Sequence, residues 1–149
     1  MTVNRWRCGI AALFVSLAQS GCAGDGIGLD PLGNPLGPGG PVPLEATLTG
    51  IQANVFSAIC IRCHTGAAAP LGLALDEGLS HGNLVGVASV ELPGLQRVNP
   101  GNPDESYVVW KIEGRSSIVG GRMPLGLDPL SAEQIAAIRG WIEAGAPDN

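Results

Sequence analysis

Three residues with sulfur and metal chemistry stand together near the middle of the chain, as Cys60-Ile-Arg-Cys63-His64. Two thiols separated by two residues can add across the two vinyl groups of a haem from a single turn of helix. The histidine that follows is placed to offer an imidazole nitrogen to the haem iron. The motif therefore predicts one covalently bound haem c, attached at Cys60 and Cys63, with His64 as an axial iron ligand.

Two other kinds of site use a Cys-x-x-Cys pair, namely a thioredoxin-like dithiol and half of a zinc site. A closed zinc site needs two more ligands, but the other cysteines, Cys8 and Cys22, fall in an apparent export segment, and His81 is the one other histidine. A thioredoxin-like pair would follow a strand, whereas an amphipathic helical pattern runs into this motif. The pentapeptide therefore favours haem attachment over both alternatives.

The ligand at the sixth coordination position of a haem iron determines whether the haem serves electron transfer or catalysis. Met123 is the only methionine besides the initiator, and Pro124 disfavours helical backbone at Met123. We therefore predict Met123 as the second axial ligand, with a methionine that only fills a core gap as the alternative. His81 is the competing ligand, although its polar surroundings are more typical of a solvated surface histidine.

Helical spacing of apolar residues defines the element that carries the haem motif. Ile51, Val55 and Ile59 recur along one face and predict a helix from about Leu48 to Cys60, so that the motif lies at its C-terminal end. The stretch that follows, residues 65–101, is rich in glycine and contains one short helical pattern around residues 76–85. A loop of this length is unusual in an ordinary core but less so if it wraps a cofactor.

Two further helices are expected in the C-terminal half. Asn102-Pro-Asp-Glu105 has the form of an N-cap, a proline at the first helical position and a capping-box glutamate. The apolar face of this helix consists of Tyr107, Val108 and Ile112. The last helix opens at Ser131 with its own capping-box glutamine, presents Ile135, Ile138, Trp141 and Ile142, and stops at Gly145.

The first twenty-two residues resemble a targeting segment. Arg5 and Arg7 form a positive n-region, residues 10–18 are apolar, and small residues lead to Cys22. The stretch is too short to cross a membrane as a helix. It resembles a bacterial lipoprotein signal, although Gln19 stands where that signal usually carries an apolar residue. We therefore expect export and lipidation at Cys22, with ordinary cleavage nearby or an uncleaved anchor as the alternatives.

Residues 23–44 hold seven glycines and five prolines, which is the composition of a flexible linker, and residues 45–149 are then one domain. Without residues 1–22 the chain keeps six basic and thirteen acidic residues, a formal charge of −7. No basic patch with interleaved aromatics occurs, so nucleic acid is not an expected partner. An acidic surface favours docking with a basic face of a redox partner, with solubility alone as the alternative.

The haem motif, the Met123-Pro124 loop and the segment Trp141-Ile-Glu-Ala-Gly-Ala146 occur in the order found in class I c-type cytochrome domains, which the chain resembles over about residues 45–147. More narrowly, residues 98–107 and 122–126 are similar to segments of the planctomycete-type cytochrome c family. The resemblance implies a small all-α class I cytochrome c fold with three or four helices wrapped around one covalently bound haem and long Gly-rich loops. The first and last helices would cross beside the haem.

The resemblance also implies roles for single residues. Cys60 and Cys63 would form the thioether bonds, and His64 and Met123 would be the axial ligands. Arg97, shortly before the predicted second helix, is suited to contact a haem propionate, with a surface or capping role as the alternative.

A histidine and methionine pair raises the reduction potential of a haem and closes its iron to small molecules. We therefore expect an electron carrier rather than an enzyme. It would transfer single electrons between unidentified redox partners on the periplasmic side of a bacterial membrane. The alternatives are a haem peroxidase or gas sensor with an open sixth position, and a fixed electron-relay subunit of a larger redox complex.

Overall fold

The computed structural model describes residues 43–149, which form one compact unit. Within the described residues the chain is helical and contains no strand, which confirms the helical class predicted from the sequence. The predicted signal segment, with its predicted lipidation site Cys22, and residues 23–42 of the predicted linker lie outside the described residues. Between residues 43 and 149, none of the helices has the length and apolar character needed to span a membrane.

The first predicted helix changes its geometry along its length. Helix α1 comprises Leu48–Ile51, the chain continues as a π-helical segment, Gln52–Phe56, and a 3₁₀ turn follows at Cys60–Arg62. The prediction of one regular α-helix from Leu48 to Cys60 is therefore wrong in geometry. This helical segment still buries one face against the core, as the spacing of apolar residues predicted.

The side chain of Gln52, at the start of the π-helical segment, is bonded to neighbouring parts of the chain. Its buried amide donates to the carbonyl of Leu75 at 2.9 Å and accepts a hydrogen bond from the hydroxyl of Ser80 at 2.6 Å. A buried polar side chain must find such partners, so the backbone around it adapts to the neighbouring segment. A π-helical turn within an α-helix is often found beside a functional site.

The Gly-rich stretch between the first and second predicted helices contains little regular structure. It holds a 3₁₀ turn at Pro70–Gly72 and the short helix α2, Ser80–Leu84, which lies within the predicted range 76–85. Beyond α2 the chain doubles back on itself through isolated β-bridges, Val85 with Val98 and Ala88 with Gln96. Backbone hydrogen bonds join the two parts of this segment, from the N–H of Gly86 to the carbonyl of Val98 at 3.0 Å and from the N–H of Arg97 to the carbonyl of Val87 at 2.7 Å.

Helix α3, Tyr107–Glu113, begins later than the sequence predicted. A separate 3₁₀ turn, Pro103–Glu105, precedes it, and the predicted capping box is wrong because the Asn102 side chain caps nothing and Glu105 accepts from Asn99 at 3.0 Å. The interruption falls at Ser106, which is fully buried with extended backbone and forms a bridge with Gln96. Tertiary pairing has therefore overridden a local cap.

The buried face of α3 also differs from the predicted one. Tyr107 and Ile112 are buried as expected, but Val109 and Lys111 are buried as well, and Val108 is only partly buried. Gly114 ends the helix in the left-handed conformation, with φ of 71°.

Helix α4, Ala132–Glu143, confirms the predicted last helix. The side chain of Ser131 accepts from the backbone of Gln134 at 3.1 Å, and the side chain of Gln134 accepts from the backbone of Ser131 at 2.9 Å, so the predicted capping box is formed. Gly145 follows with φ of 97°. Gly140 permits a close approach of the segment before α1, because a Cβ atom there would lie 3.2 Å from Cβ of Ala46.

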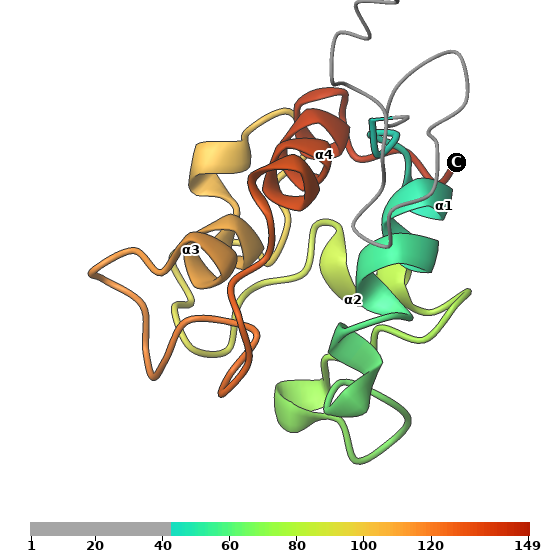
Figure 1. Ribbon diagram of the computed structural model, residues 1–149. Coiled ribbons are helices and arrows are strands. Elements are labelled where there is room, and N and C mark those ends of the chain that lie inside the picture. Colours follow the sequence, from blue (N-terminus) through green and yellow to red (C-terminus); the bar gives the residue numbers. More distant parts are fainter. Residues whose placement is uncertain (1–42) are drawn as a thin grey trace, which may run out of the picture. The chain divides into compact units, whose positions relative to one another are not determined.

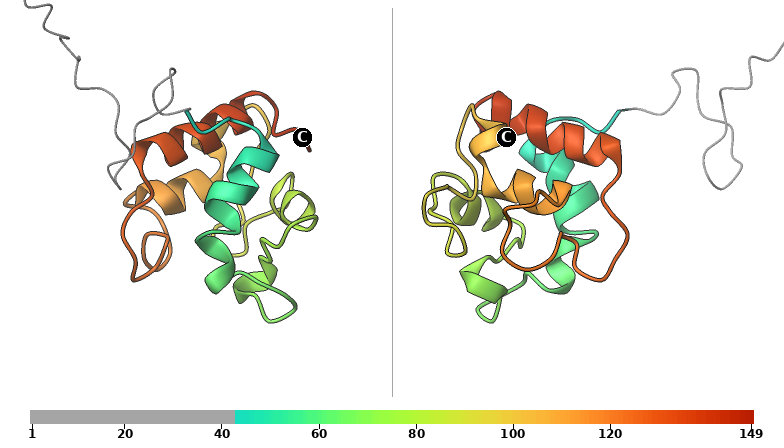
Figure 2. Two further views of the ribbon diagram at one scale, coloured as in Figure 1. Left: turned by 45° about the vertical axis from the view of Figure 1, so that its right-hand side comes forward. Right: turned by 90° about the vertical axis from the view of Figure 1, so that its left-hand side faces the viewer.

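The core of the domain lies where α4 packs against both α1 and α3 (Figure 1). Its most deeply buried apolar side chains are Ile51, Val55, Leu84, Val98, Val109, Ile138, Trp141 and Ile142. Residues 60–73 and the loop 114–131 both project on the side of the domain away from α4, and the further views agree on this arrangement (Figure 2). The two segments that carry the sequence-predicted chemistry therefore border the same region.

Candidate functional site

A cavity of about 390 Å³ opens in this region, and it gathers the residues that the sequence singled out. Cys60, Cys63, His64, Arg97 and Met123 all line it, although they come from three separate segments of the chain. The rest of its wall is mainly aliphatic and includes Val55, Leu75, Leu84, Leu125, Leu127 and Ile138. The volume lies within the range of roughly 300–1,000 Å³ that is usual for ligand and cofactor pockets.

The imidazole of His64 is oriented by its own neighbourhood. Its Nδ1 atom lies 3.1 Å from the carbonyl oxygen of Leu73, and its backbone carbonyl accepts from the N–H of Leu75 at 2.8 Å. A carbonyl oxygen can only accept a hydrogen bond, so Nδ1 carries the proton. In the neutral ring the lone pair is then on Nε2, which leaves that atom available to bind a metal.

The two cysteines of the motif differ in their surroundings. Both thiols are free, but Cys60 is half-buried and Cys63 is exposed. Burial raises the pKa of the Cys60 thiol to about 11, so this thiol remains protonated at neutral pH. In a thioredoxin-like pair the attacking thiol has a lowered pKa, and the raised pKa of Cys60 runs in the opposite direction.

Met123 reaches the cavity from the loop between α3 and α4. Its backbone N–H donates to the carbonyl of Lys111 at 2.9 Å, its side chain packs against the edge of the core, and its peptide bond to Pro124 is cis. The backbone at Met123 is not helical, as the following proline predicted. The thioether is thus presented from a loop to the same cavity that the imidazole of His64 lines.

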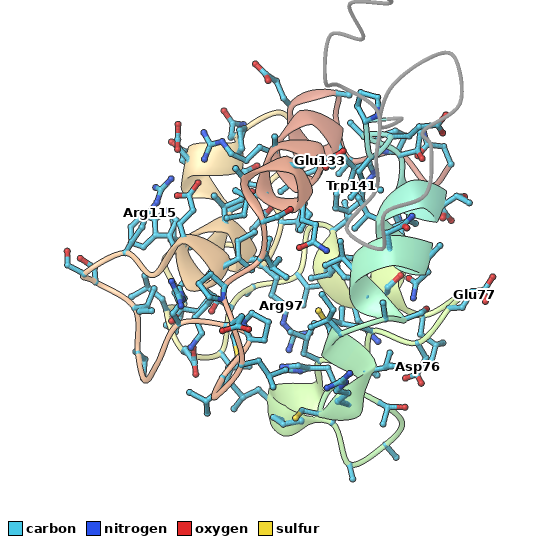
Figure 3. All side chains as sticks on the ribbon, in the orientation of Figure 1. Asp76, Glu77, Arg97, Arg115, Glu133 and Trp141 are labelled. Carbon is cyan, nitrogen blue, oxygen red and sulfur yellow. The ribbon has the colours of Figure 1, made fainter. Side chains whose placement is uncertain are left out.

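Arg97 extends toward the middle of the domain, whereas Asp76, Glu77 and Arg115 lie at its edge (Figure 3). Its guanidinium donates to the carbonyl oxygens of Leu71 at 2.6 Å and of Asn83 at 2.7 Å. Burial lowers its pKa from the ordinary value. Arg97 therefore joins the loop that carries Leu71 to the last turn of α2, while it also lines the cavity.

The second histidine lies elsewhere. His81 does not line the cavity, and its Nε2 atom is 2.9 Å from the carbonyl oxygen of Ala146. Its half-buried ring also meets the Trp141 ring edge-on, with 6.4 Å between the centroids. The expectation of a solvated surface histidine is therefore wrong, since His81 joins α2 to the segment after α4.

A polar cluster on the cavity wall was missed from the sequence. Tyr107 and Lys111 of α3 both bind one carboxylate oxygen of Glu91, at 2.8 and 3.0 Å, and all three residues line the cavity. Lys111 stands four positions after Tyr107, on the same helix face, and this spacing was the available signal. Glu91 could not be predicted as their partner, because a contact across a loop produces no regular spacing in the sequence.

The residues that line the cavity fit a haem. The mainly aliphatic wall suits a flat apolar macrocycle, and the Cys60 and Cys63 thiols stand within one turn of each other at its border. His64 offers a free Nε2 atom, and Met123 offers the thioether that is the usual partner of histidine in electron-transfer haems.

Comparison with known proteins adds nothing to this assignment. No protein-family model, curated protein or solved structure matches the chain. The chemistry of the cavity must therefore be inferred from its own residues.

Proposed function

We propose that the protein is a monohaem c-type cytochrome that transfers single electrons at the bacterial cell envelope. The haem would be bound through thioether bonds to Cys60 and Cys63, with His64 and Met123 as the axial ligands. One observation carries the proposal. Met123, which lies far from the Cys-x-x-Cys-His motif in sequence, lines the same cavity as the motif.

A haem bound here supplies an iron that accepts and releases one electron between its ferrous and ferric states. The chain's own residues determine how freely it does so. Leu73 fixes the tautomer of His64, and the hydrogen bond strengthens the imidazole as a ligand. The thioether of Met123 would fill the position at which a small molecule otherwise binds. Aliphatic walls keep water away from the iron and favour the state with the lower charge.

The arrangement of the helices also supports the proposal. The sequence resemblance implied a class I cytochrome c fold in which the first and last helices meet beside the haem. Helix α4 packs against α1, and Val55 of the π-helical segment after α1 and Ile138 of α4 both belong to the core and line the cavity. We therefore propose this fold for residues 45–149.

The cellular setting is part of the same proposal. Covalent haem attachment takes place outside the bacterial cytoplasm, which agrees with the signal-like residues 1–22 and with lipidation at Cys22. A domain with an excess of acidic residues would meet basic faces on its redox partners, and this encounter would weaken with salt.

Absorption spectroscopy of the ferric holoprotein tests the iron ligation. We expect a far-red charge-transfer band from methionine ligation, and we expect the band to disappear in Met123→Ala. Leu127→Ala, which truncates another cavity-lining side chain of the same loop, is the matched control and should keep the band. Met123→Ala should also bind carbon monoxide rapidly in the ferrous state. A wild-type protein that lacks the band and binds carbon monoxide rapidly would instead support an open-site sensor or peroxidase.

A further inference from the structure

We propose that Glu91, Tyr107 and Lys111 are positioning residues for Met123, and that they hold the loop 114–131 against α3. We name these three residues the loop clamp. The inference rests on the proposed function, because the position of Met123 matters only if its thioether binds a haem iron.

The loop clamp forms hydrogen bonds with both backbone polar groups of one loop residue. The N–H of Val119 donates to the hydroxyl oxygen of Tyr107 at 3.0 Å, and the carbonyl of Val119 accepts from Nζ of Lys111 at 2.7 Å. Nearby, the N–H of Met123 donates to the backbone carbonyl of Lys111 at 2.9 Å. The loop is thus attached to α3 on both sides of its double glycine, Gly120-Gly121.

Glu91 orients the two side chains that reach the loop. Its Oε2 atom accepts from the Tyr107 hydroxyl at 2.8 Å and from Nζ of Lys111 at 3.0 Å. The tyrosine proton is therefore directed to Glu91, which leaves the oxygen lone pair free to accept the N–H of Val119. The side chains of Lys111 and Glu91 are only 10% and 23% exposed, so salt screens this pair less than a surface pair.

The segment between the two attachment points has little stiffness of its own. Gly120 has φ of 70° and Gly121 has no side chain to restrict it, so this part of the loop has a large conformational freedom to lose. Nζ of Lys111 lies close to Gly120, 3.9 Å from the position a Cβ atom would take. Hydrogen bonds to α3 and the packing of the Met123 side chain against the core, rather than local backbone preference, therefore keep Met123 at the cavity.

A buried ion pair is weak support for stability, since desolvation offsets much of its attraction. The loop clamp is better explained by specificity, because it selects one position of a glycine-rich loop. It also joins two segments that border the cavity, the doubled-back segment that carries Glu91 and the loop that carries Met123. Loss of the clamp should therefore affect the ligation of Met123 more than the stability of the core.

The test compares ferric holoproteins in which an added ligand competes with Met123. Imidazole can bind only after the thioether leaves the iron, so its apparent affinity reports how readily the loop opens. Tyr107→Phe removes the hydroxyl and little else, and we expect about threefold to tenfold tighter imidazole binding, as befits one or two lost hydrogen bonds. Hydrogen exchange at the Val119 amide should accelerate in the same variant.

Ser106→Ala is the matched control. It also removes a buried hydroxyl, beside Tyr107 in sequence, but that hydroxyl bonds Asn99 and Asn102 and does not touch the loop. Its unfolding midpoint should fall, whereas its imidazole affinity should stay within twofold of the wild type. If Tyr107→Phe yields no holoprotein, Glu91→Gln addresses the same question, because it weakens the anchor and leaves in place the Tyr107 hydroxyl that accepts from the loop and the Lys111 ammonium that donates to it.

Failure of the inference and failure of the proposed function give different results. A far-red band in the wild type, with equal imidazole affinities in all variants, would overturn the loop clamp and leave the cytochrome standing. A wild type without the band would overturn both. A parallel rise of imidazole affinity in Tyr107→Phe and Ser106→Ala would assign the effect to general destabilisation and overturn the clamp.

Discussion

The two sides of the cavity are built in different ways. On the side of His64, the ligand is held by bonds within its own segment, from the carbonyl of Leu73 and the N–H of Leu75. On the side of Met123, the loop is held by two side chains of α3, which Glu91 orients, and by one bond from the Met123 N–H to the backbone carbonyl of Lys111. A ligand fixed by local backbone bonds keeps its place when distant contacts change, whereas a ligand held by long-range side chains does not. We therefore expect the Met123 side to open first under any stress.

The largest expected effect comes from removing the locally held ligand. His64→Ala loses the ring that Leu73 orients and, in the holoprotein, its bond to the iron. We expect the free energy of unfolding of the ferric holoprotein to fall by more than about 2 kcal/mol, and by more than in Met123→Ala. Guanidinium unfolding followed by circular dichroism measures both variants. Equal losses of unfolding free energy in His64→Ala and Met123→Ala would contradict the expected difference between the two sides of the cavity.

A smaller effect is expected where the Met123 loop leaves α3. Gly114 has φ of 71°, and a Cβ atom there would lie 2.9 Å from Cδ of Arg122 in the loop. Gly114→Ala should cost about 1–2 kcal/mol of stability from the left-handed backbone, and should also displace the loop and tighten imidazole binding. Gly126→Ala is the control on the same loop, because Gly126 has φ of 72° but open space around it. It should lose stability without a change in imidazole affinity, and a similar affinity change in both variants would count against a specific displacement.

The smallest expected effect concerns acid. Hydrogen bonds from Arg115 and Arg139 hold the pKa of Asp104 below its ordinary value, and this network lies where α3, α4 and the start of the loop meet. A lowered pKa contributes stability that is present above the ordinary pKa of aspartate, near 4, and is lost as the pH falls through the lowered value. Asp104→Asn should therefore be slightly less stable than the wild type at pH 7, and the difference should vanish in strong acid.

The difference should stay small because the Asp104 side chain is 70% exposed. Unfolding midpoints of the two ferric holoproteins between pH 2 and pH 7 provide the measurement. A difference that grows toward low pH would contradict the assigned direction of the pKa shift.

Local signals in the sequence predicted the parts of the structure that local contacts decide. The capping box of Ser131 and Gln134 is formed because both partners lie within one helical turn and nothing else competes for them. The similar pattern at Asn102 and Glu105 fails because the buried Ser106 pairs with Gln96, a contact that no short window reveals. The helical class could thus be predicted from the sequence, but the residue at which α3 begins could not.

The candidate site follows the same division. Cys60, Cys63, His64 and Met123 could be chosen because their side-chain chemistry is rare in this chain and specific to one cofactor. Glu91 and Lys111 could not, since charged side chains usually lie in solvent, and only the folded chain shows that these two are partly withdrawn from it. Residues that do chemistry leave a signature in the sequence, whereas residues that hold them in position need not.

The bond between His64 and Leu73 has a further consequence for the order of folding. It closes a loop of nine residues. The bond from Lys111 to Val119 closes one of eight, but the loop clamp is complete only when Glu91 meets Tyr107 and Lys111, sixteen and twenty residues away. Shorter loops close faster and at a lower entropic cost, so we expect the His64 side of the cavity to assemble early and the Met123 side to dock last. During refolding of the ferric holoprotein, a histidine-ligated species without its methionine should therefore accumulate first, and the docking of the loop 114–131 should set the time at which the iron is closed.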